Sequence, residues 1–374
     1  MKLHHFLTIA ILSTALPLTT ALPALGQPAR PAEDANQAGP RNNEPPPQKV
    51  PNALKEPPAV PKEVSTPIDK DLRARATAIV VEMAGDKDPV LRCNATEAAQ
   101  RTLGTGADSP GRAIVMNGLS DPSPLVQFAS IVAAGETNLL DAYQPILSMA
   151  YHPDVNVRLA VRFALHKFGD RRLSNELLQG LDDSNRLVRS NTLILLGLLK
   201  EKSAVPAVRR MLADRYPTVR LQAAETMWRL RDNLGFEELV AKSLSKYPDE
   251  QIIALVALAG PGDVRVVDHI RGQLINEYVE VALAAARGCG NLGVDDGYTI
   301  AMQALKSEDP RVRVLAAFAL GAIGRPDSQQ ALAPLLADAD ANVKLAGATA
   351  QPLGPTSAPG CDEPTSRCQT SPSM

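Results

Sequence analysis

Few residues in this chain have the types and spacing that chemistry requires. Beyond the N-terminal apolar segment the histidines are His152, His166 and His269. A general base needs a partner within hydrogen-bond reach, and the spacing around these histidines supplies none. The motifs of activated serines and of phosphate-binding loops, GxSxG and GxxxxGK followed by Ser or Thr, are absent from the sequence. We therefore predict no catalytic residue, no cofactor and no metal site.

Two of the four cysteines lie close together near the C-terminus. Cys361 and Cys368 belong to a tail, residues 355–374, that is rich in Pro, Ser and Thr and is predicted to be flexible. Oxidation is permitted in exported proteins, so we predict a disulfide between them, with free thiols or metal ligands as the alternatives. Two thiols without a nearby histidine make a weak zinc site.

Residues 1–26 have the pattern of an export signal. Lys2 opens the segment, residues 6–18 are mostly apolar, and Ala24-Leu25-Gly26 offers a cleavage site with small residues. An uncleaved membrane anchor is the alternative, but polar residues and Pro17 interrupt an apolar run that is already short. We expect cleavage before Gln27, no transmembrane segment afterwards, and a location in the periplasm, the cell envelope or outside the cell.

The next stretch, residues 27–67, holds 11 prolines in 41 positions. Such a composition buries too little apolar surface to offset the entropy of ordering, so we predict a disordered linker. Docking into an aromatic groove of a partner is the alternative. The folded domain is then expected to occupy residues 68–354.

That domain is organised around a repeated helix, of which Asp309–Gly324 is the clearest copy. Asp309 can cap the helix, Pro310 suits its first position, apolar residues recur at helical spacing, and Gly324 can end it. Slots equivalent to Val312 recur at intervals of 30 to 35 residues, at Leu91, Val126, Val157, Val188, Val219, Gln251, Val281, Val312 and Val343. Nine copies in one register predict a repeat protein.

Each repeat also contains a second short amphipathic segment, so one unit is a pair of helices. Short helices are stable only when their apolar faces stack, and no segment alternates in the manner of a strand. The sequence thus predicts an all-α fold, a right-handed α-solenoid of about nine two-helix units. We expect an elongated stack, with the helix over residues 68–83 shielding one end and the second helices forming the concave face.

The motif D-P-x-V-R-x-x-A-x-x-A-L-G resembles the HEAT-like repeats of the bacterial phycobilin-lyase type. Its best copy is Asp309-Pro310-Arg311-Val312-Arg313 with Ala316, Ala319, Leu320 and Gly321. The resemblance covers roughly residues 70–350 and implies the fold, because this repeat serves many unrelated tasks. The His-Glu pairs that hold iron in the related deoxyhypusine hydroxylases are absent, which argues against that enzyme class.

An arginine ladder follows the reference slot by one residue, at Arg92, Arg158, Arg189, Arg220 and Arg313. It could bind phosphates, but an Asp lies four residues before several members, a spacing that favours a helical ion pair of ~0.2–0.5 kcal/mol. We interpret the ladder as structural. Ile252 and Ala282 interrupt it, which indicates either a deeply buried centre or an apolar groove.

Trp228 occupies a slot that is glycine in several repeats. It either fills a gap between units or projects as an interface anchor. If one residue binds a partner, we expect Trp228, with Tyr216, Met227 and Arg231 around it. Cys93 and Cys289 lie six units apart, on the order of 60 Å in a straight stack, so both are predicted to be packing residues.

A formal charge of −2 gives no reason to expect nucleic acid as a partner. The sequence therefore favours an exported, non-catalytic scaffold that binds an unidentified protein. A lyase or lyase-like chaperone similar to the bilin-attaching family is one alternative. A role in envelope assembly or in assisting protein folding is another.

Overall fold

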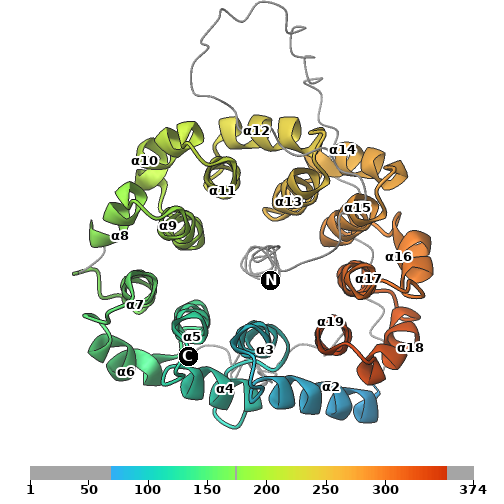
Figure 1. Cartoon of the computed structure of the whole chain (residues 1–374), viewed down its shortest axis with the longest axis horizontal. Helices are drawn as coiled ribbons and strands as arrows, with labels where there is room; N and C mark the ends of the chain where they lie inside the picture. The colour runs from blue at the N-terminus through green and yellow to red at the C-terminus, as the bar shows by residue number, and fades with distance from the viewer. Residues whose placement is uncertain (1–68, 173–174, 352–374) are drawn as a thin grey trace, which may run out of the picture.

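The computed structural model describes residues 69–172 and 175–351, and within these ranges the chain is helical without strands. Helices alternate between an outer and an inner layer (Figure 1). The inner layer contains α3 (Pro89–Thr102), α5 (Pro124–Glu136), α7 (Val155–Lys167), α9 (Arg186–Leu199), α11 (Pro217–Arg229), α13 (Pro248–Ala259), α15 (Val279–Asn291), α17 (Pro310–Ile323) and α19 (Ala341–Ala350).

The outer layer contains α2 (Lys70–Met83), α4 (Pro110–Gly118), α6 (Tyr143–Ser148), α8 (Asn175–Gln179), α10 (Val205–Arg210), α12 (Asn233–Ser243), α14 (Val267–Gly272), α16 (Tyr298–Ala304) and α18 (Ser328–Leu332). Short 3-10 turns extend several of these: η1 (Leu140–Ala142), η2 (Gly180–Asp182), η3 (Lys202–Ala204), η4 (Met211–Ala213), η5 (Val264–Val266), η6 (Gln273–Ile275) and η7 (Ala333–Ala337). The predicted solenoid of helix pairs is thus confirmed. The prediction that the second helices form the concave face is wrong, because they form the outer layer.

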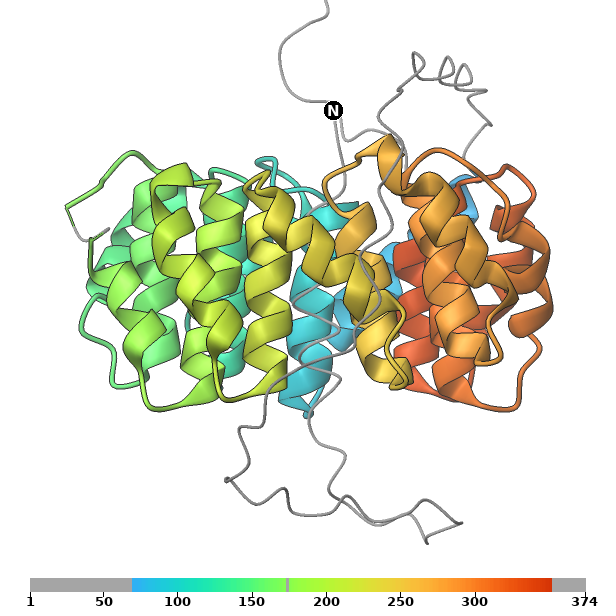
Figure 2. The same ribbon diagram turned by 90° about the horizontal axis from the view of Figure 1, so that it is seen from above.

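The array does not end as an open stack but closes into a ring. Its last helix, α19, packs against α2 and α3, and Figures 1 and 2 show the two ends of the array side by side. Leu72, Ala76 and Val80 of α2 share one buried apolar cluster with Leu345 and Ala348 of α19. The expectation of an elongated stack is therefore wrong, and α2 joins the first repeat to the last instead of shielding an end.

The inner helices form for the reasons that the sequence predicted. The side chain of Asp309 accepts a hydrogen bond from the backbone N–H of Arg311, α17 begins at Pro310, and Gly324 ends it with a φ of 68°. Gly290 marks where α15 and α17 approach closely. A Cβ there would lie 2.5 Å from the backbone nitrogen of Ile323, so only glycine permits this packing.

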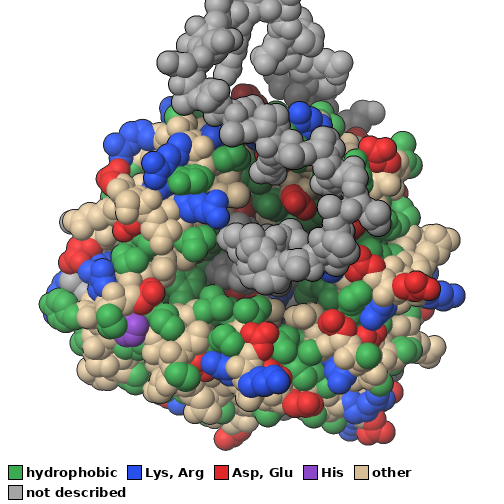
Figure 3. Space-filling model, in the orientation of Figure 1, with side chains coloured by type: hydrophobic (Ala, Val, Ile, Leu, Met, Phe, Trp, Pro, Cys, Tyr) green, Lys and Arg blue, Asp and Glu red, His purple; other side chains and the backbone are tan. Residues whose placement is uncertain are grey.

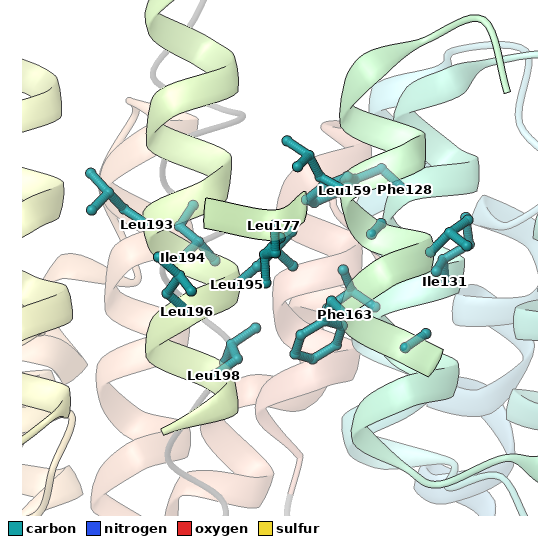
Figure 4. Close-up of a cluster of buried hydrophobic side chains, with 14 of the residues drawn as sticks. Phe128, Ile131, Leu159, Phe163, Leu177, Leu193, Ile194, Leu195, Leu196 and Leu198 are labelled. Atoms are coloured by element: carbon teal, nitrogen blue, oxygen red, sulfur yellow. The ribbon is translucent and has the colours of Figure 1, made fainter. Parts of the chain in front are cut away.

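Apolar side chains between the two layers make a core that runs from repeat to repeat. Figure 4 shows part of it, where Phe163 of α7, Leu177 of α8 and Leu195 of α9 meet. All three are at most 1 % exposed. Each such side chain contributes roughly 1.5–3 kcal/mol on burial, so the stacked faces stabilise helices that are too short to form alone.

The repeat is more regular in the structure than the spacing of the slots equivalent to Val312 indicated. The N-cap residues of the inner helices are Asp88, Ser123, Asp154, Asn185, Tyr216, Tyr247, Tyr278, Asp309 and Asp340. After the first interval of 35 residues, every interval is 31 residues. The ladder position of the sixth repeat is therefore Gln251, and the prediction that Ile252 occupies it is wrong by one residue.

The ladder arginines connect each repeat to the next. Arg189 makes a bidentate ion pair with Asp214, at 2.7 and 3.0 Å, and donates to the carbonyls of Asp183 and Ser184. Matching ion pairs join Arg92 to Asp121 and Arg313 to Asp338. Arg158 and Arg220 likewise donate to turn carbonyls. These contacts favour the structural interpretation of the ladder. The Asp residues four positions earlier cap the helices.

Cys93 and Cys289 are both buried and free. Their predicted separation assumed a straight stack and fails in a ring. The helix α15 that carries Cys289 reaches the helix α3 that carries Cys93 through α17 and α19 alone. The predicted signal segment, the linker and the Cys361–Cys368 disulfide lie outside the described residues.

Candidate functional site

Charged side chains occupy two positions of the inner helices, nine and thirteen residues after the N-cap. Glu97, Glu225 and Arg287 hold the first position, and Arg101, Glu136, Lys167 and Arg229 hold the second. They come from α3, α5, α7, α11 and α15, which all belong to the inner layer of the ring (Figure 1). We call these seven residues the inner charge set.

Electrostatic effects connect members of this set on helices that are far apart around the ring. Burial raises the pKa of Glu136 on α5. The charge of Lys167 opposes this rise, and so, least strongly, does that of Arg229 on α11, although α7 and α9 separate α5 from α11 around the ring. Burial lowers the pKa of Arg287 on α15, and the charge of Arg101 on α3 adds to this shift. Both pairs of residues thus come from inner helices that are not neighbours in the ring.

Part of the inner charge set is paired. Lys167 lies 3.1 Å from the carboxylate of Glu136 and joins α7 to α5. Arg229 makes a 2.8 Å ion pair with Glu225 one helical turn earlier, and the side chains are 9 % and 1 % exposed. A buried pair must satisfy both charges, because the desolvation penalty rivals the attraction.

Among the described residues, neither Glu97 nor Arg287 has a partner in an ion pair. Glu97 is 3 % exposed, and neither carboxylate oxygen has a hydrogen-bond partner there. Burial raises its pKa to about 7, and the charge of Arg101 opposes that shift. The Arg287 guanidinium lies 5.5 Å from the ring centre of Phe318, and burial lowers its pKa to about 9. A fold has no structural need for either charge, so both are candidates for ligand recognition.

Replacing Glu97 with glutamine is expected to change how stability depends on pH. The folded pKa of about 7 exceeds the ordinary value of 4.5, so the wild-type protein loses stability as pH rises through this window. The variant should be more stable at pH 8 by up to about 3 kcal/mol and equal near pH 4. Urea denaturation at both pH values measures the difference. Glu82→Gln, on the exposed side of α2, should show none at either pH.

Three of the remaining inner helices carry apolar side chains at the first of these positions. Ile194, Val256 and Phe318 stand nine residues after the N-caps of α9, α13 and α17. Arg287 contacts Phe318, so the two kinds of surface meet. On the outside, side chains of both signs lie around the outer helices on the face seen in Figure 3. The inner face therefore suits a ligand with apolar and charged groups together.

The structure does not bring the predicted partner-binding residues onto one surface. Trp228 is 1 % exposed, donates a 3.0 Å hydrogen bond to the carbonyl of Leu258, and packs on Phe236 at 5.2 Å. Met227 is fully buried. These contacts favour the packing interpretation of Trp228 over the interface interpretation.

Arg231 and Tyr216 lie at opposite ends of α11. Arg231 follows the helix, has a φ of 66° and donates to the carbonyl of Pro261 at 2.9 Å. Tyr216 is the N-cap at the other end and is surrounded by Arg186, Arg189 and Arg215 at 4.9–5.6 Å. A helix of 13 residues spans roughly 20 Å, so they cannot contact the same small group.

One serine–histidine pair escaped the sequence analysis. The Oγ of Ser243 lies 2.6 Å from Nε2 of His269, whose pKa is lowered by burial. Ser243 also donates to the carbonyl of Val240 at 2.7 Å and is fully buried. Its proton is thus committed to a backbone oxygen, so the pair links α12 to α14 and does not form an activated nucleophile.

The inner charge set was also missed. Its signal was present as charged residues at fixed distances from the N-caps, but which face of a helix lines the interior depends on tertiary packing. The spacing of residues along a helix does not tell which of its faces will line the interior.

A family model of HEAT repeats agrees with this architecture of helix pairs. Residues 174–271 and 272–350 match the HEAT-repeat family. Among solved structures, the complex of CpcE and CpcF of phycocyanin lyase from Nostoc sp. PCC7120 is 18% identical, with a TM-score of 0.40, over 66% of this chain and 97% of that chain. Human deoxyhypusine hydroxylase is 18% identical, with a TM-score of 0.34, over 76% and 96%. A search of curated proteins gave no significant match.

Proposed function

Because this chain is a HEAT-repeat protein whose array closes into a ring, we propose that it is an exported, non-catalytic scaffold that binds a polypeptide segment on its inner face. The inner charge set is the observation that supports this proposal. Burying charged groups costs desolvation energy, and neither the Glu97 carboxylate oxygens nor Nη1 of Arg287 has a hydrogen-bond partner among the described residues.

The composition of the inner face suits a protein ligand. Acidic and basic side chains share the inner helices with apolar residues at the same register, such as Ile194, which is buried, and Phe318, which is half-buried. A polyanion such as nucleic acid would be repelled by Glu97, Glu136 and Glu225, and the overall charge of −2 offers no attraction. A polypeptide with mixed charges and an apolar stripe can match both kinds of position.

Export is supported by the sequence of residues 1–26 and places the partner in the periplasm, the cell envelope or outside the cell. Among the described helices, none is long and apolar enough to cross a bilayer. N-terminal sequencing of the protein recovered from a cell-envelope fraction tests export, with a mature start at Gln27 as the expected result. A chain that keeps Met1 in the cytoplasm would contradict it.

Partner capture is expected to depend on Arg287. The Arg287→Met variant keeps the apolar contact with Phe318 but removes the inner charge, and should weaken capture about 30-fold, the effect of losing a ~2 kcal/mol contact. Affinity purification from the native envelope fraction identifies the partner, and titration with that purified partner measures the change.

Arg209→Met is the matched control, because Arg209 lies on outer helix α10 with a side chain that is 57 % exposed. It should bind the partner as tightly as the wild-type protein does. An equal loss of partner affinity in both variants, or no loss of affinity in Arg287→Met, would contradict binding on the inner face. Trp228→Ala is not informative here, since it empties a buried site and is expected to cost ~3–5 kcal/mol of stability.

A further inference from the structure

Three consecutive inner helices carry tyrosine at the N-cap, where the other repeats carry Asp, Asn or Ser; Ser123 of α5 also makes no capping hydrogen bond. Tyr216, Tyr247 and Tyr278 are the N-caps of α11, α13 and α15, and none makes a capping hydrogen bond from its side chain. We call these three residues the tyrosine row. The side chains of Asp88, Asp154, Asn185, Asp309 and Asp340 do cap their helices.

The missing caps have a cost, which indicates a second role for these positions. A good N-cap stabilises a helix by ~1 kcal/mol relative to a residue that cannot cap. Tyr247 and Tyr278 instead remain 44% and 41% exposed. The turns that precede them add Leu244 at 62% and Ile275 at 92% exposure. One rim of the ring, over α11, α13 and α15 (Figure 1), therefore presents aromatic and aliphatic side chains to solvent.

Cations hold two of these aromatic rings in place. The Arg215 guanidinium lies 4.9 Å from the ring centre of Tyr216, and the Lys246 amine lies 5.1 Å from that of Tyr247. Such contacts stabilise one rotamer and reduce the entropy that a ligand must overcome. The tyrosine row is thus a preorganised aromatic surface.

The spacing of the row matches an extended proline-rich chain. Adjacent inner helices that pack directly lie ~8–10 Å apart. A polyproline II helix repeats every three residues and rises ~9.3 Å over that repeat. Successive tyrosines therefore meet every third residue of such a ligand, and aromatic-lined grooves are the usual receptors for proline-rich segments.

We propose that the tyrosine row docks the chain's own proline-rich segment around Pro45-Pro46-Pro47. The 21 residues between Pro47 and Asp69, where the described chain begins, extend to ~65 Å in a polyproline conformation. Nine inner helices at ~8–10 Å spacing make a ring only ~25–30 Å across at their axes, so the segment reaches the row from any point. Tethering also supplies an effective concentration in the millimolar range, enough to fill a weak site.

Trypsin cleavage after Lys49 in the full chain tests this docking. With millimolar effective concentration and a dissociation constant of ~0.1 mM, the docked segment should be cut about tenfold more slowly than a synthetic peptide of residues 41–56. The double variant Tyr247→Asn and Tyr278→Asn should restore cleavage to the rate of the free peptide. Asparagine is the residue that caps α9, so the variant removes the rings without weakening the helices.

Tyr151→Asn is the matched control, because Tyr151 is 94% exposed in the turn before α7 but lies outside the row. It should leave the slow cleavage unchanged. Cleavage after Lys49 that is as fast in the wild-type chain as in the peptide would overturn the proposal. Slow cleavage after Lys49 that persists in the double variant would also overturn it. A third outcome is tyrosine fluorescence that responds to added peptide while cleavage after Lys49 in the intact chain is fast. That result would assign the tyrosine row to a partner's segment and would also overturn the proposal.

Discussion

Replacing Ala348 with aspartate is expected to open the ring. Ala348 on α19 is fully buried in the cluster that joins the last repeat to α2. A carboxylate in this apolar cluster would be desolvated, and an uncompensated buried charge costs ~3–5 kcal/mol. We expect the α2–α19 contact to open first, because every other helix pair is also connected through a short turn. Small-angle scattering should show the maximum dimension rising by at least one repeat spacing, ~10 Å.

The helix content distinguishes opening from unfolding. In the Ala348→Asp variant, far-ultraviolet circular dichroism should retain nearly the wild-type signal, since stacking between successive repeats does not require closure. Ala316→Asp is the matched control, because Ala316 is equally buried but lies in the cluster between stacked repeats. It should lose helical signal. An Ala348→Asp protein with unchanged dimensions would show that the α2–α19 contact does not hold the ring closed.

Replacing Arg189 with methionine is expected to cause the second large effect. Arg189 and Asp214 are each 7 % exposed in their side chains, and the variant leaves the Asp214 carboxylate buried without its cation. The expected cost is ~3–5 kcal/mol, well above the few tenths that the sequence pattern indicated for these arginines. Arg220→Met is the comparison, because Arg220 donates to two turn carbonyls without a described acidic partner and should cost only ~1 kcal/mol.

The difference between wild type and Arg189→Met should shrink in acid. Burial raises the pKa of Asp214, but hydrogen bonds from Arg189 and from the backbone N–H of Tyr216 outweigh burial and hold it below the ordinary value. A lowered pKa contributes stability above the unfolded value near 4, and this contribution is lost as pH falls through the folded value. Denaturation in urea at pH 7 and pH 3 measures the change. A gap of the same size at both pH values would assign the effect to packing alone.

Local chemistry explains why the repeat could be predicted. Pro310 and Asp309 begin α17, and Gly324 ends it, through interactions among residues close in sequence. The ladder shows the limit of this reasoning. Asp309 does cap its helix, but the acid that pairs with Arg313 is Asp338 in the next repeat, which helical spacing could not identify. Trp228 shows the same limit, since its exposure depends on α12 and α13.

The sequence by itself determined the helix pairs, their number and their register to within one residue, because capping, helix termination and apolar periodicity act over a few positions. The tertiary structure decided that the array closes, which helices form the inner layer, and that the charged residues of α3, α5, α11 and α15 lie on inner helices. These features depend on the small rotation between successive repeats. No single repeat encodes that rotation, and it becomes visible only when nine of them accumulate into a full turn.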